Sequence, residues 1–379
     1  MELCLVVDHA CNLRCRYCYT GEKFSRTMSA ATVVKAAELA LSYDRDWLSV
    51  SLFGGEPLLA EGVLSRVEAA VESVLACLER RPSLRWLIDT NATLLDGDAL
   101  DWLAAHENAS VIASLDGPAE VHNLHRVDAR GHGSHAAVMA GLEGLRKRRI
   151  DFQLVAVVSP STAAQLPASL SHLLGLGASR IALQADLRSE WSDSALAAFR
   201  QGTLAAAQIW EQEFRSGRAI EIEPLHSKLL AHLTETLPIP GRCRLGARQL
   251  TVAPSGRAYP CAEMVGEDRA DDLSIGHVDG GIDASRLLAL RERSQIEHEA
   301  CQRCPLRARC SRGCACRQLA STGSVGGVSA LLCETEASWI DAADAAANRL
   351  VADRVSAFMD MYYGVASEMT EPGSGSLHA

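Results

Sequence analysis

The sequence lacks any run of about 18 or more uncharged apolar residues, so no membrane-spanning helix is expected. Its first residues, Met1 to Asn12, lack the basic region, the long apolar core and the cleavage site of a secretory signal. It also lacks a basic surplus, because 37 lysines and arginines face 47 aspartates and glutamates, for a formal charge of −10. This balance argues against a nucleic acid partner, whose phosphates require a basic surface. We therefore expect a cytoplasmic protein that binds neither membranes nor nucleic acid.

Cysteine is absent between Cys77 and Cys243, although the chain contains 13 cysteines. Three crowd the N-terminus, at Cys11, Cys15 and Cys18, and most of the others follow Cys243. Structural disulfides are rare in a reducing cytosol, so this many thiols indicate metal binding or redox chemistry. The distribution predicts two metal-bearing regions separated by a cysteine-free body.

The body of the chain reads as alternating strands and helices. Hydrophobic residues make up 48% of the sequence, which excludes global disorder, and 379 residues allow one barrel of ~200–250 residues plus a smaller module. Short apolar segments alternate with helical patterns and predict six strand–helix units of a parallel sheet. Periodicity leaves open a doubly wound sheet and an incomplete barrel, but polar motifs at the carboxyl ends of the strands favour the barrel. The expected strands cover residues 2–7, 47–53, 84–89, 110–115, 152–158 and 180–184.

The strand–helix rhythm stops near residue 237, where prolines and a glycine at 238–241 indicate a boundary. We expect a barrel over 1–236 and a small cysteine-rich module, held by metal, over 237–337. A C-terminal helix is expected over 338–370, with its regular part at 338–363, and a disordered tail over 371–379. The fold class is therefore α/β, with a partial (β/α)6 barrel, a cysteine-rich module and a C-terminal helix.

The N-terminal cysteines have the spacing Cys-x3-Cys-x2-Cys on the loop after the first expected strand. Cys11, Cys15 and Cys18 could hold three irons of a [4Fe–4S] cluster and leave the fourth iron open to another ligand. A zinc site, which His9 could complete, is the alternative. The spacing, with Tyr17 before the last cysteine, resembles the signature of the radical SAM enzymes. The resemblance implies that S-adenosylmethionine (SAM) binds the open iron and yields a 5′-deoxyadenosyl radical, which takes hydrogen from a substrate.

Two further motifs are similar to those of the same superfamily. Gly54, Gly55 and Glu56 follow the second expected strand and resemble the motif that holds the amino group of SAM. Ser114 and Arg126 follow the fourth and belong to a stretch that resembles SxDGxxxxHxxxR of the sulfatase-maturing branch, with the guanidinium facing the SAM carboxylate. Each motif alone is compatible with a tight turn or an exposed arginine. The resemblance implies the following SAM-binding residues: Tyr17, Gly54, Gly55, Glu56, Ser114 and Arg126.

The C-terminal cysteines match the positions and intervals of the SPASM domain, which holds auxiliary iron–sulfur clusters in many radical SAM enzymes. Zinc is the alternative for paired cysteines of this kind. The resemblance implies two auxiliary clusters, expected to be [4Fe–4S] like the SAM cluster. The outer cluster is assigned Cys301, Cys304, Cys310 and Cys333. The inner cluster, nearer the active site, is assigned Cys243, Cys261 and Cys314, with Cys316 as a possible further ligand.

The chain departs from the sulfatase-maturing enzymes at three positions. Leu237 stands where those enzymes have a further cysteine, so the inner cluster has only three thiolates unless Cys316 or another residue completes it. Ala262 replaces their catalytic aspartate, which leaves Glu263 as a candidate base that would point to the other face of an extended segment. Phe53 replaces a glutamine that touches SAM. These differences put formylglycine formation in doubt.

The resemblance implies an oxidoreductase that acts on a ribosomally made peptide and forms an oxidative crosslink, a C–C or thioether bond. Formylglycine-type oxidation and epimerisation are alternatives within the enzyme class, and a non-catalytic metal-binding scaffold is the alternative outside it. Gln184 and Asp186, near Arg188 at the end of the sixth expected strand, are expected to face the substrate. The expected partners are the precursor peptide and an electron donor such as flavodoxin or ferredoxin. A separate leader-recognition protein is a further expected partner, because the chain begins directly at its first strand.

Overall fold

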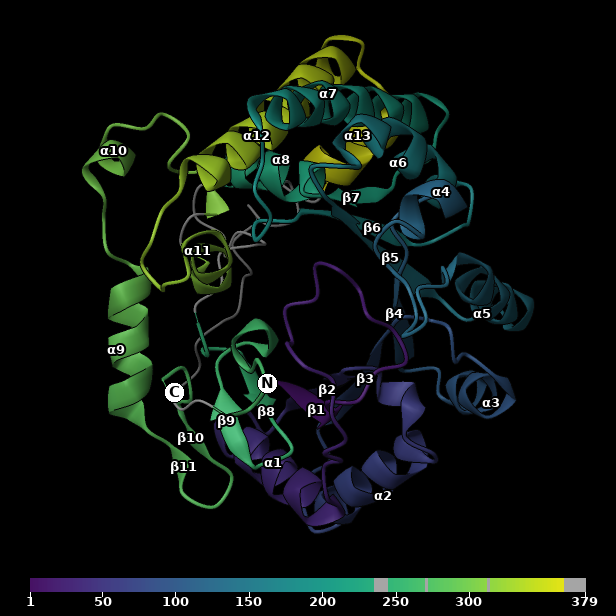
Figure 1. Cartoon of the computed structure of the whole chain (residues 1–379), viewed down its shortest axis with the longest axis vertical. Helices are drawn as coiled ribbons and strands as arrows, with labels where there is room; N and C mark the ends of the chain where they lie inside the picture. The colour runs from purple at the N-terminus through teal and green to yellow at the C-terminus, as the bar shows by residue number, and fades with distance from the viewer. Residues whose placement is uncertain (235–244, 270–271, 312–313, 365–379) are drawn as a thin grey trace, which may run out of the picture.

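The computed structural model describes residues 1–234, 245–269, 272–311 and 314–364. These residues form one sheet of eleven strands in the order β11-β10-β9-β8-β1-β2-β3-β4-β5-β6-β7. Neighbours from β8 through β1 to β7 are parallel, whereas β8–β9, β9–β10 and β10–β11 are antiparallel. The sheet curves with its helices on the outer side and does not close on itself, which confirms the α/β class and the partial barrel (Figure 1).

The strands are β1 Glu2–Asp8, β2 Trp47–Gly54, β3 Ser83–Thr90, β4 Ala109–Ser114, β5 Phe152–Val158, β6 Arg180–Ala185, β7 Glu221–Glu223, β8 Gln249–Val252, β9 Arg257–Tyr259, β10 Gly276–His277 and β11 Gly281–Ile282. The helices are α1 Ala30–Tyr43, α2 Val63–Leu75, α3 Gly97–Ala105, α4 Ala119–His122, α5 His135–Arg148, α6 Leu166–Leu174, α7 Asp193–Arg215, α8 Leu225–Leu233, α9 Ala284–Ser294, α10 Glu299–Gln302, α11 Ala315–Thr322, α12 Ala330–Ala352 and α13 Ser356–Met359.

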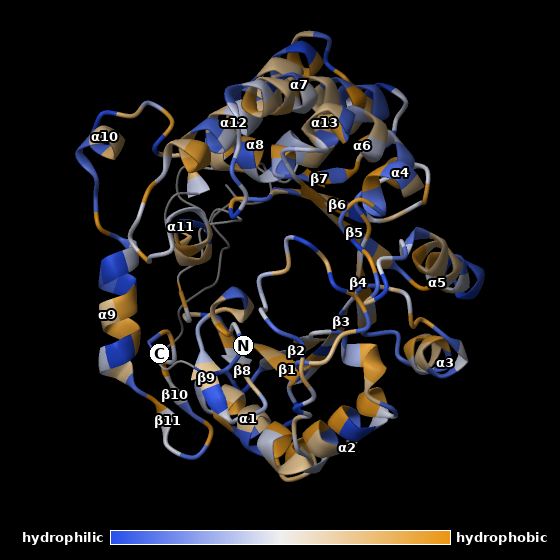
Figure 2. Ribbon diagram, viewed as in Figure 1, coloured by the Kyte–Doolittle hydropathy of each residue, from blue (hydrophilic) through white to orange (hydrophobic). Residues whose placement is uncertain are grey.

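The core lies between the strands and the outer helices. In β5, Phe152, Leu154, Ala156 and Val158 are buried against helices, and the residues between them point to the concave face of the sheet. The apolar residues in Figure 2 follow the strands and the inward sides of the helices, while polar residues face outward. Burial of this apolar surface is the main term that holds the helices on the sheet.

Five strands that the sequence did not predict extend the sheet, β7 at one side and β8 to β11 at the other. β7 pairs in parallel with β6, and β8 pairs in parallel with β1, from Glu2 opposite Gln249 to Leu5 opposite Val252. Both strands are short, so neither carries the apolar run that identifies a strand in a sequence. The second pairing makes the C-terminal region a continuation of the barrel sheet and brings its cysteines to the barrel's edge.

The long C-terminal helix differs in position from the expected one. α12 begins at Ala330, where Ser329 accepts a hydrogen bond from Leu332 N at 3.1 Å, and ends at Ala352. A short helix, α13, and a π-helical turn at Asp360–Gly364 follow it. The helix therefore includes Cys333. The boundary at 238–241 and the tail at 371–379 lie outside the described residues.

No helix in the described ranges is long and apolar enough to cross a membrane.

Candidate functional site

The loop that follows β1 lies on the concave side of the sheet (Figure 1). Asp8, the last residue of β1, fixes both ends of this loop. Its carboxylate accepts hydrogen bonds from Ala10 N at 2.8 Å, from Arg26 N at 3.0 Å and from the Thr27 hydroxyl. Burial alone would raise the pKa of Asp8, but these hydrogen bonds outweigh it and lower the pKa. Asp8 was not among the predicted site residues, although its place as a polar residue at the carboxyl end of a barrel strand was a signal for it.

The three N-terminal cysteines are half-buried on this loop. Leu13 N donates to Cys11 Sγ at 3.4 Å, and Lys23 Nζ donates to Cys18 Sγ at 3.0 Å. Burial raises the pKa of Cys11 to about 11. In Cys18, hydrogen bonds from Thr20 and Lys23 outweigh burial and lower the pKa. Sulfurs that accept hydrogen bonds suit a cluster, since such bonds tune its reduction potential.

The two glycines at the end of β2 are required by the close approach of this loop. Gly54 has φ 152°, and a Cβ added to it would lie 2.3 Å from Asp8 O. A Cβ on Gly55 would lie 2.1 Å from Ala10 O, and Gly55 N donates to Asp8 O at 2.8 Å. The glycines therefore join β2 to the base of the cysteine loop, a role that the sequence alone did not indicate.

Glu56 is fully buried and joins the ends of β2 and β3. Its carboxylate accepts hydrogen bonds from Leu58 N at 3.1 Å, Thr90 Oγ1 at 2.7 Å and Asn91 N at 2.7 Å. Burial raises the pKa of Glu56 to about 7, although the hydrogen bonds act in the opposite direction. An ionised carboxylate has about four acceptor sites, so Glu56 has capacity for one further donor, such as an amino group.

Asp116 is the centre of a buried cluster between the cysteine loop and β4. Its carboxylate accepts hydrogen bonds from the Tyr17 hydroxyl, from Arg126 Nε at 3.1 Å and from Val157 N at 3.0 Å. The Arg126 guanidinium also lies 5.3 Å from the centre of the Tyr17 ring. Burial works against the charge of Arg126, but Asp116 outweighs it and raises the pKa of the arginine. Asp116 is the aspartate of the stretch that resembles SxDGxxxxHxxxR, but the sequence alone did not indicate its role.

Ser114, at the end of β4, is half-buried, and its hydroxyl makes no hydrogen bond within the part of the chain that the structure describes. The candidate SAM-binding side chains thus come from the carboxyl ends of three strands of the same sheet, β1, β2 and β4, with β3 between the last two. Tyr17 comes from the loop after β1, Glu56 from the end of β2, and Ser114 with Arg126 from the end of β4 and the segment after it. This is the edge at which barrel enzymes place their sites.

The C-terminal cysteines gather in two groups. Hydrogen bonds link the Cys316 thiol to Cys261 and Cys314, and they raise the pKa of Cys316 and lower that of Cys314. Cys333 lies near Cys301 and Cys304, and burial and the charges of these two cysteines raise its pKa. Cys310 is half-buried in the segment before α11, and Cys243 lies outside the described residues.

No three His, Cys, Asp or Glu side chains of the described ranges converge as ligands of one ion. A zinc site needs four ligands that converge on one point, whereas in a cubane cluster each thiolate binds a different iron. His9 stacks on Phe24, with ring centres 4.7 Å apart, and its buried Nε2 has no partner among the described residues.

The candidate substrate-facing residues occupy different environments. Gln184 is exposed at the end of β6. The buried carboxylate of Asp186 accepts hydrogen bonds from Arg188 N at 3.0 Å and Ser189 Oγ at 2.5 Å, so it shapes its own loop. Glu263, in a short 3₁₀ turn at Ala262–Met264, accepts a hydrogen bond from Arg188 at 3.3 Å.

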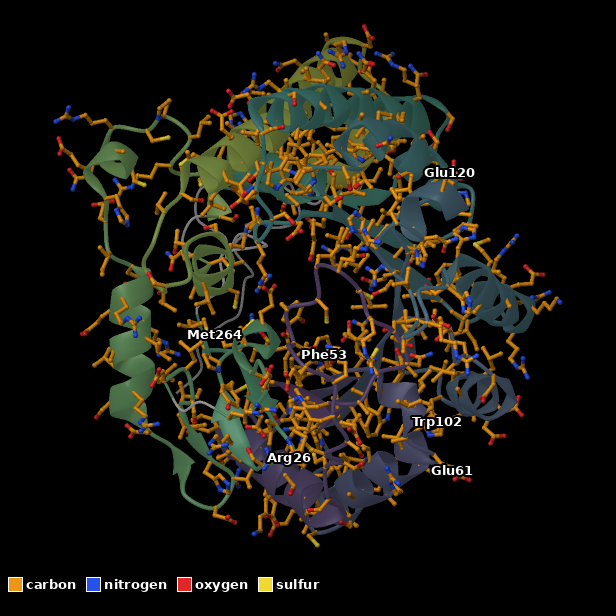
Figure 3. The ribbon with its side chains drawn as sticks, in the orientation of Figure 1. Arg26, Phe53, Glu61, Trp102, Glu120 and Met264 are labelled. Atoms are coloured by element: carbon orange, nitrogen blue, oxygen red, sulfur yellow. The ribbon has the colours of Figure 1, made fainter. Side chains whose placement is uncertain are left out.

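The ring of Tyr19, the residue directly after Cys18, contacts both Arg188 and Phe53 of β2. The Arg188 guanidinium lies 5.1 Å from the centre of its ring. The ring of Phe53 also stacks on the ring of Tyr19, with ring centres 6.3 Å apart. Figure 3 shows Phe53 on the inner side of the curved sheet. An apolar residue thus stands where the sulfatase-maturing branch has its glutamine.

Replacement of Gly55 by alanine is expected to prevent assembly of the N-terminal site. The added Cβ would meet the backbone of Ala10, which cannot move without displacing the cysteine loop. We expect the variant to lose about four irons per chain and its SAM-dependent activity, as measured by iron analysis. Gly97→Ala is the matched control, because a Cβ there meets nothing within 4 Å and the residue starts α3. Equal iron contents in the two variants would contradict the expectation.

Comparisons with known proteins agree with this geometry. Residues 5–170 match the model of the radical SAM superfamily. The chain is 28% identical over 336 residues to the serine-type anaerobic sulfatase-maturating enzyme of Klebsiella aerogenes, covering 81% of this chain and 78% of that protein. It is 30% identical over 166 residues to the cysteine-type enzyme of Clostridium perfringens, covering 40% of this chain and 42% of that protein.

Solved structures show the same fold. Native anSMEcpe with bound AdoMet superposes with a TM-score of 0.77 at 20% identity, covering 92% of this chain and 99% of the other. Streptococcus suis SuiB bound to the precursor peptide SuiA superposes with a TM-score of 0.63 at 16% identity, covering 88% of this chain and 75% of SuiB. The sequence match identifies a radical SAM domain over residues 5–170 of this chain, and the solved structures share its fold.

Proposed function

We propose that this enzyme uses SAM to oxidise a ribosomally made peptide and that it forms a crosslink within that peptide. The observation that carries the proposal is the meeting of four groups at one sheet edge: the three-cysteine loop, the glycine end of β2, Glu56, and the Tyr17–Asp116–Arg126 cluster. Two similar proteins of known structure were solved with peptides, SuiB with its precursor peptide and anSMEcpe with the Cp18Cys peptide. This supports a peptide as the substrate.

In the proposed reaction, Cys11, Cys15 and Cys18 hold the [4Fe–4S] cluster, which supplies the electron that cleaves SAM when both are bound. Glu56 offers its remaining acceptor site to the SAM amino group. Arg126, already held by Asp116, presents its other guanidinium N–H groups to the SAM carboxylate. Phe53 and the Tyr19 ring form an apolar wall that keeps water from the reactive carbon.

The same proposal assigns two auxiliary clusters to the C-terminal region. Cys261, Cys314 and Cys316 would hold the inner cluster together with Cys243, and their contacts favour Cys316 as the ligand that replaces the cysteine missing at Leu237. Cys301, Cys304, Cys310 and Cys333 would hold the outer cluster. Such clusters accept electrons, and a crosslink needs an electron acceptor because it removes a pair of hydrogens. A flavodoxin or ferredoxin would reduce the SAM cluster.

Anaerobic co-expression with a peptide encoded beside the gene tests the proposal. We expect the intact peptide to lose one or more pairs of hydrogens and to resist fragmentation between the joined residues. Co-expression with the Cys15→Ala variant serves as the control and should leave the mass unchanged. A peptide whose mass is unchanged by the wild-type enzyme, and which gains no deuterium in deuterated water, would contradict oxidation and epimerisation alike.

Formylglycine formation is the second candidate, and the similarity to sulfatase-maturating enzymes over most of the chain favours it. Oxidation of a serine to formylglycine also removes one pair of hydrogens, so mass alone does not distinguish it from a crosslink. Formylglycine is an aldehyde and reacts with an aminooxy probe, whereas a C–C or thioether crosslink does not. A probe-reactive product would establish the second candidate and contradict the first.

A further inference from the structure

Asp89 is a half-buried carboxylate that has fewer partners than the fully buried carboxylates of the described residues. Its neighbours in β3, Ile88 and Thr90, are buried on the helix side, so Asp89 points to the concave face of the sheet. Its Oδ2 accepts one hydrogen bond, from Ser51 Oγ at 2.7 Å, and among the described residues it forms no ion pair. By contrast, Glu56 accepts three hydrogen bonds and Glu336 accepts bonds from Lys228 and Ser311.

Asp89 combines partial enclosure with acceptor sites that no described residue uses. Desolvation disfavours the charged form of a carboxylate unless hydrogen bonds or cations replace the lost water. Partial burial raises the pKa of Asp89 to about 6, and the hydrogen bond from Ser51 offsets only part of this effect. A carboxylate on the concave face with unused acceptor sites and a raised pKa is a candidate for chemistry.

The neighbours of Asp89 place it between the two cysteine regions. Cys4, Ser51 and Asp89 lie on the adjacent strands β1, β2 and β3, with Cys4 in register with Ser51. Burial raises the pKa of Cys4, and the charges of Asp89 and Cys261 raise it further. Burial also raises the pKa of Tyr19, and Glu263, Cys261, Cys4 and Asp89 act in the same direction. Asp89 therefore shares one region of the concave face with the residue after Cys18 and with Cys261.

The other candidate base, Glu263, already has a cationic partner. Its carboxylate lies 3.3 Å from the Arg188 guanidinium. The titratable groups whose charges interact with that of Asp89 are Cys4, Tyr19 and Glu56, and none of them is a cation. Asp89 thus has unused acceptor sites and no cationic partner among the described residues.

We propose that Asp89 is the base that accepts a proton from the bound peptide during its oxidation, an inference that rests on the proposed function. Removal of two hydrogens from the peptide requires three acceptors. One hydrogen atom goes to the 5′-deoxyadenosyl radical and gives 5′-deoxyadenosine. One electron goes to an auxiliary iron–sulfur cluster, and the remaining proton goes to the Asp89 carboxylate as the new bond forms. The charges and hydrogens balance.

The test compares Asp89→Asn with Glu263→Gln, both isosteric, in the cluster-loaded enzyme with the precursor peptide. Asp89→Asn is expected to lower peptide oxidation by about 10²–10⁴-fold, while SAM cleavage continues, so that 5′-deoxyadenosine accumulates without product. In Glu263→Gln, the ratio of oxidised peptide to 5′-deoxyadenosine is expected to equal that of the wild type. The proposal would be overturned if Asp89→Asn formed as much oxidised peptide per 5′-deoxyadenosine as the wild type. It would also be overturned if Glu263→Gln, and not Asp89→Asn, lost peptide oxidation.

The pH dependence of melting tests the state of Asp89 without any peptide and so separates this inference from the proposed function. The pKa of Asp89 in the folded chain, about 6, lies above its ordinary value of 3.8. Folding therefore favours the protonated form, and stability falls as the pH rises from about 4 through 6. Asp89→Asn is expected to melt higher than wild type above pH 7 and to converge with it near pH 4. Parallel curves would overturn the proposal even if the peptide is modified.

Discussion

Replacement of Cys15 by alanine is expected to abolish the formation of 5′-deoxyadenosine. Cys15 lies between Cys11 and Cys18 on the loop after β1, and a cubane cluster bound through fewer thiolates loses an iron or does not assemble. Without the cluster no electron reaches SAM. The measurement is chromatography of the nucleosides formed from SAM and dithionite under anaerobic conditions.

Cys77→Ala is the matched control for this experiment. Cys77 is exposed after α2, far along the chain from either cysteine region, and its thiol donates only to Ser73 O at 3.4 Å. We expect wild-type rates from this variant. Undiminished 5′-deoxyadenosine formation in Cys15→Ala would show that the N-terminal loop does not hold the cluster that cleaves SAM. Iron analysis of Cys15→Ala shows whether the auxiliary clusters are still present, which distinguishes a local loss from a failure to fold.

Replacement of Glu336 by glutamine is expected to destabilise the enzyme by about 3–5 kcal/mol, because it leaves the buried ammonium of Lys228 and the half-buried guanidinium of Arg317 without their counter-ion. The Glu336 carboxylate accepts from Lys228 Nζ at 2.6 Å, from Ser311 N at 2.6 Å and from Arg317 at 3.0 Å. It therefore links α12 to α8 and to the cysteine segment, the stretch that contains Cys310 and Ser311. Anaerobic urea unfolding of the cluster-loaded enzyme measures the effect.

The neighbouring Glu334 provides the control on the same helix. Glu334 pairs with Arg200 at 2.7 Å, but both side chains are about half exposed, so Glu334→Gln is expected to cost no more than about 1 kcal/mol. Equal effects of the two substitutions would show that Glu336 does not hold the cysteine segment.

The stabilising effect of Glu336 is also expected to depend on pH. Burial would raise its pKa, but the charges of Arg317 and Lys228 outweigh burial and lower the pKa from 4.5 to about 2. Because the folded chain favours the charged form, this stabilisation is complete above about pH 4.5 and is lost as the pH falls toward 2. The difference in the free energy of unfolding between wild type and Glu336→Gln should therefore become smaller as the pH falls from about 4.5 toward 2.

The sequence predicted the parts of the fold that depend on local patterns. Strands such as β5 are apolar and include β-branched residues, and α1 begins where the Ser29 side chain accepts a hydrogen bond from Thr32 N. The motif positions at strand ends followed from the same pattern, because parallel strands end at one edge of the sheet.

The parts that were not predicted depend on contacts between distant residues. The partners Lys228 and Glu336 are 108 residues apart, so no local pattern marks them as a pair. The pairing of β8 with β1 and the early start of α12 likewise follow from packing. Asp89 ends the third expected strand, and a sequence does not show that its carboxylate has a single hydrogen-bond partner among the described residues.

The number of 5′-deoxyadenosine molecules formed for each pair of hydrogens lost from the peptide tests most directly how this enzyme oxidises its substrate. Both products are measured in one anaerobic reaction of the wild-type enzyme with SAM, a reductant and the precursor peptide. We expect one 5′-deoxyadenosine for each pair of hydrogens lost, because one hydrogen atom goes to the radical and the second leaves as a proton and an electron. Formation of 5′-deoxyadenosine with no loss of hydrogen from the peptide would contradict peptide oxidation.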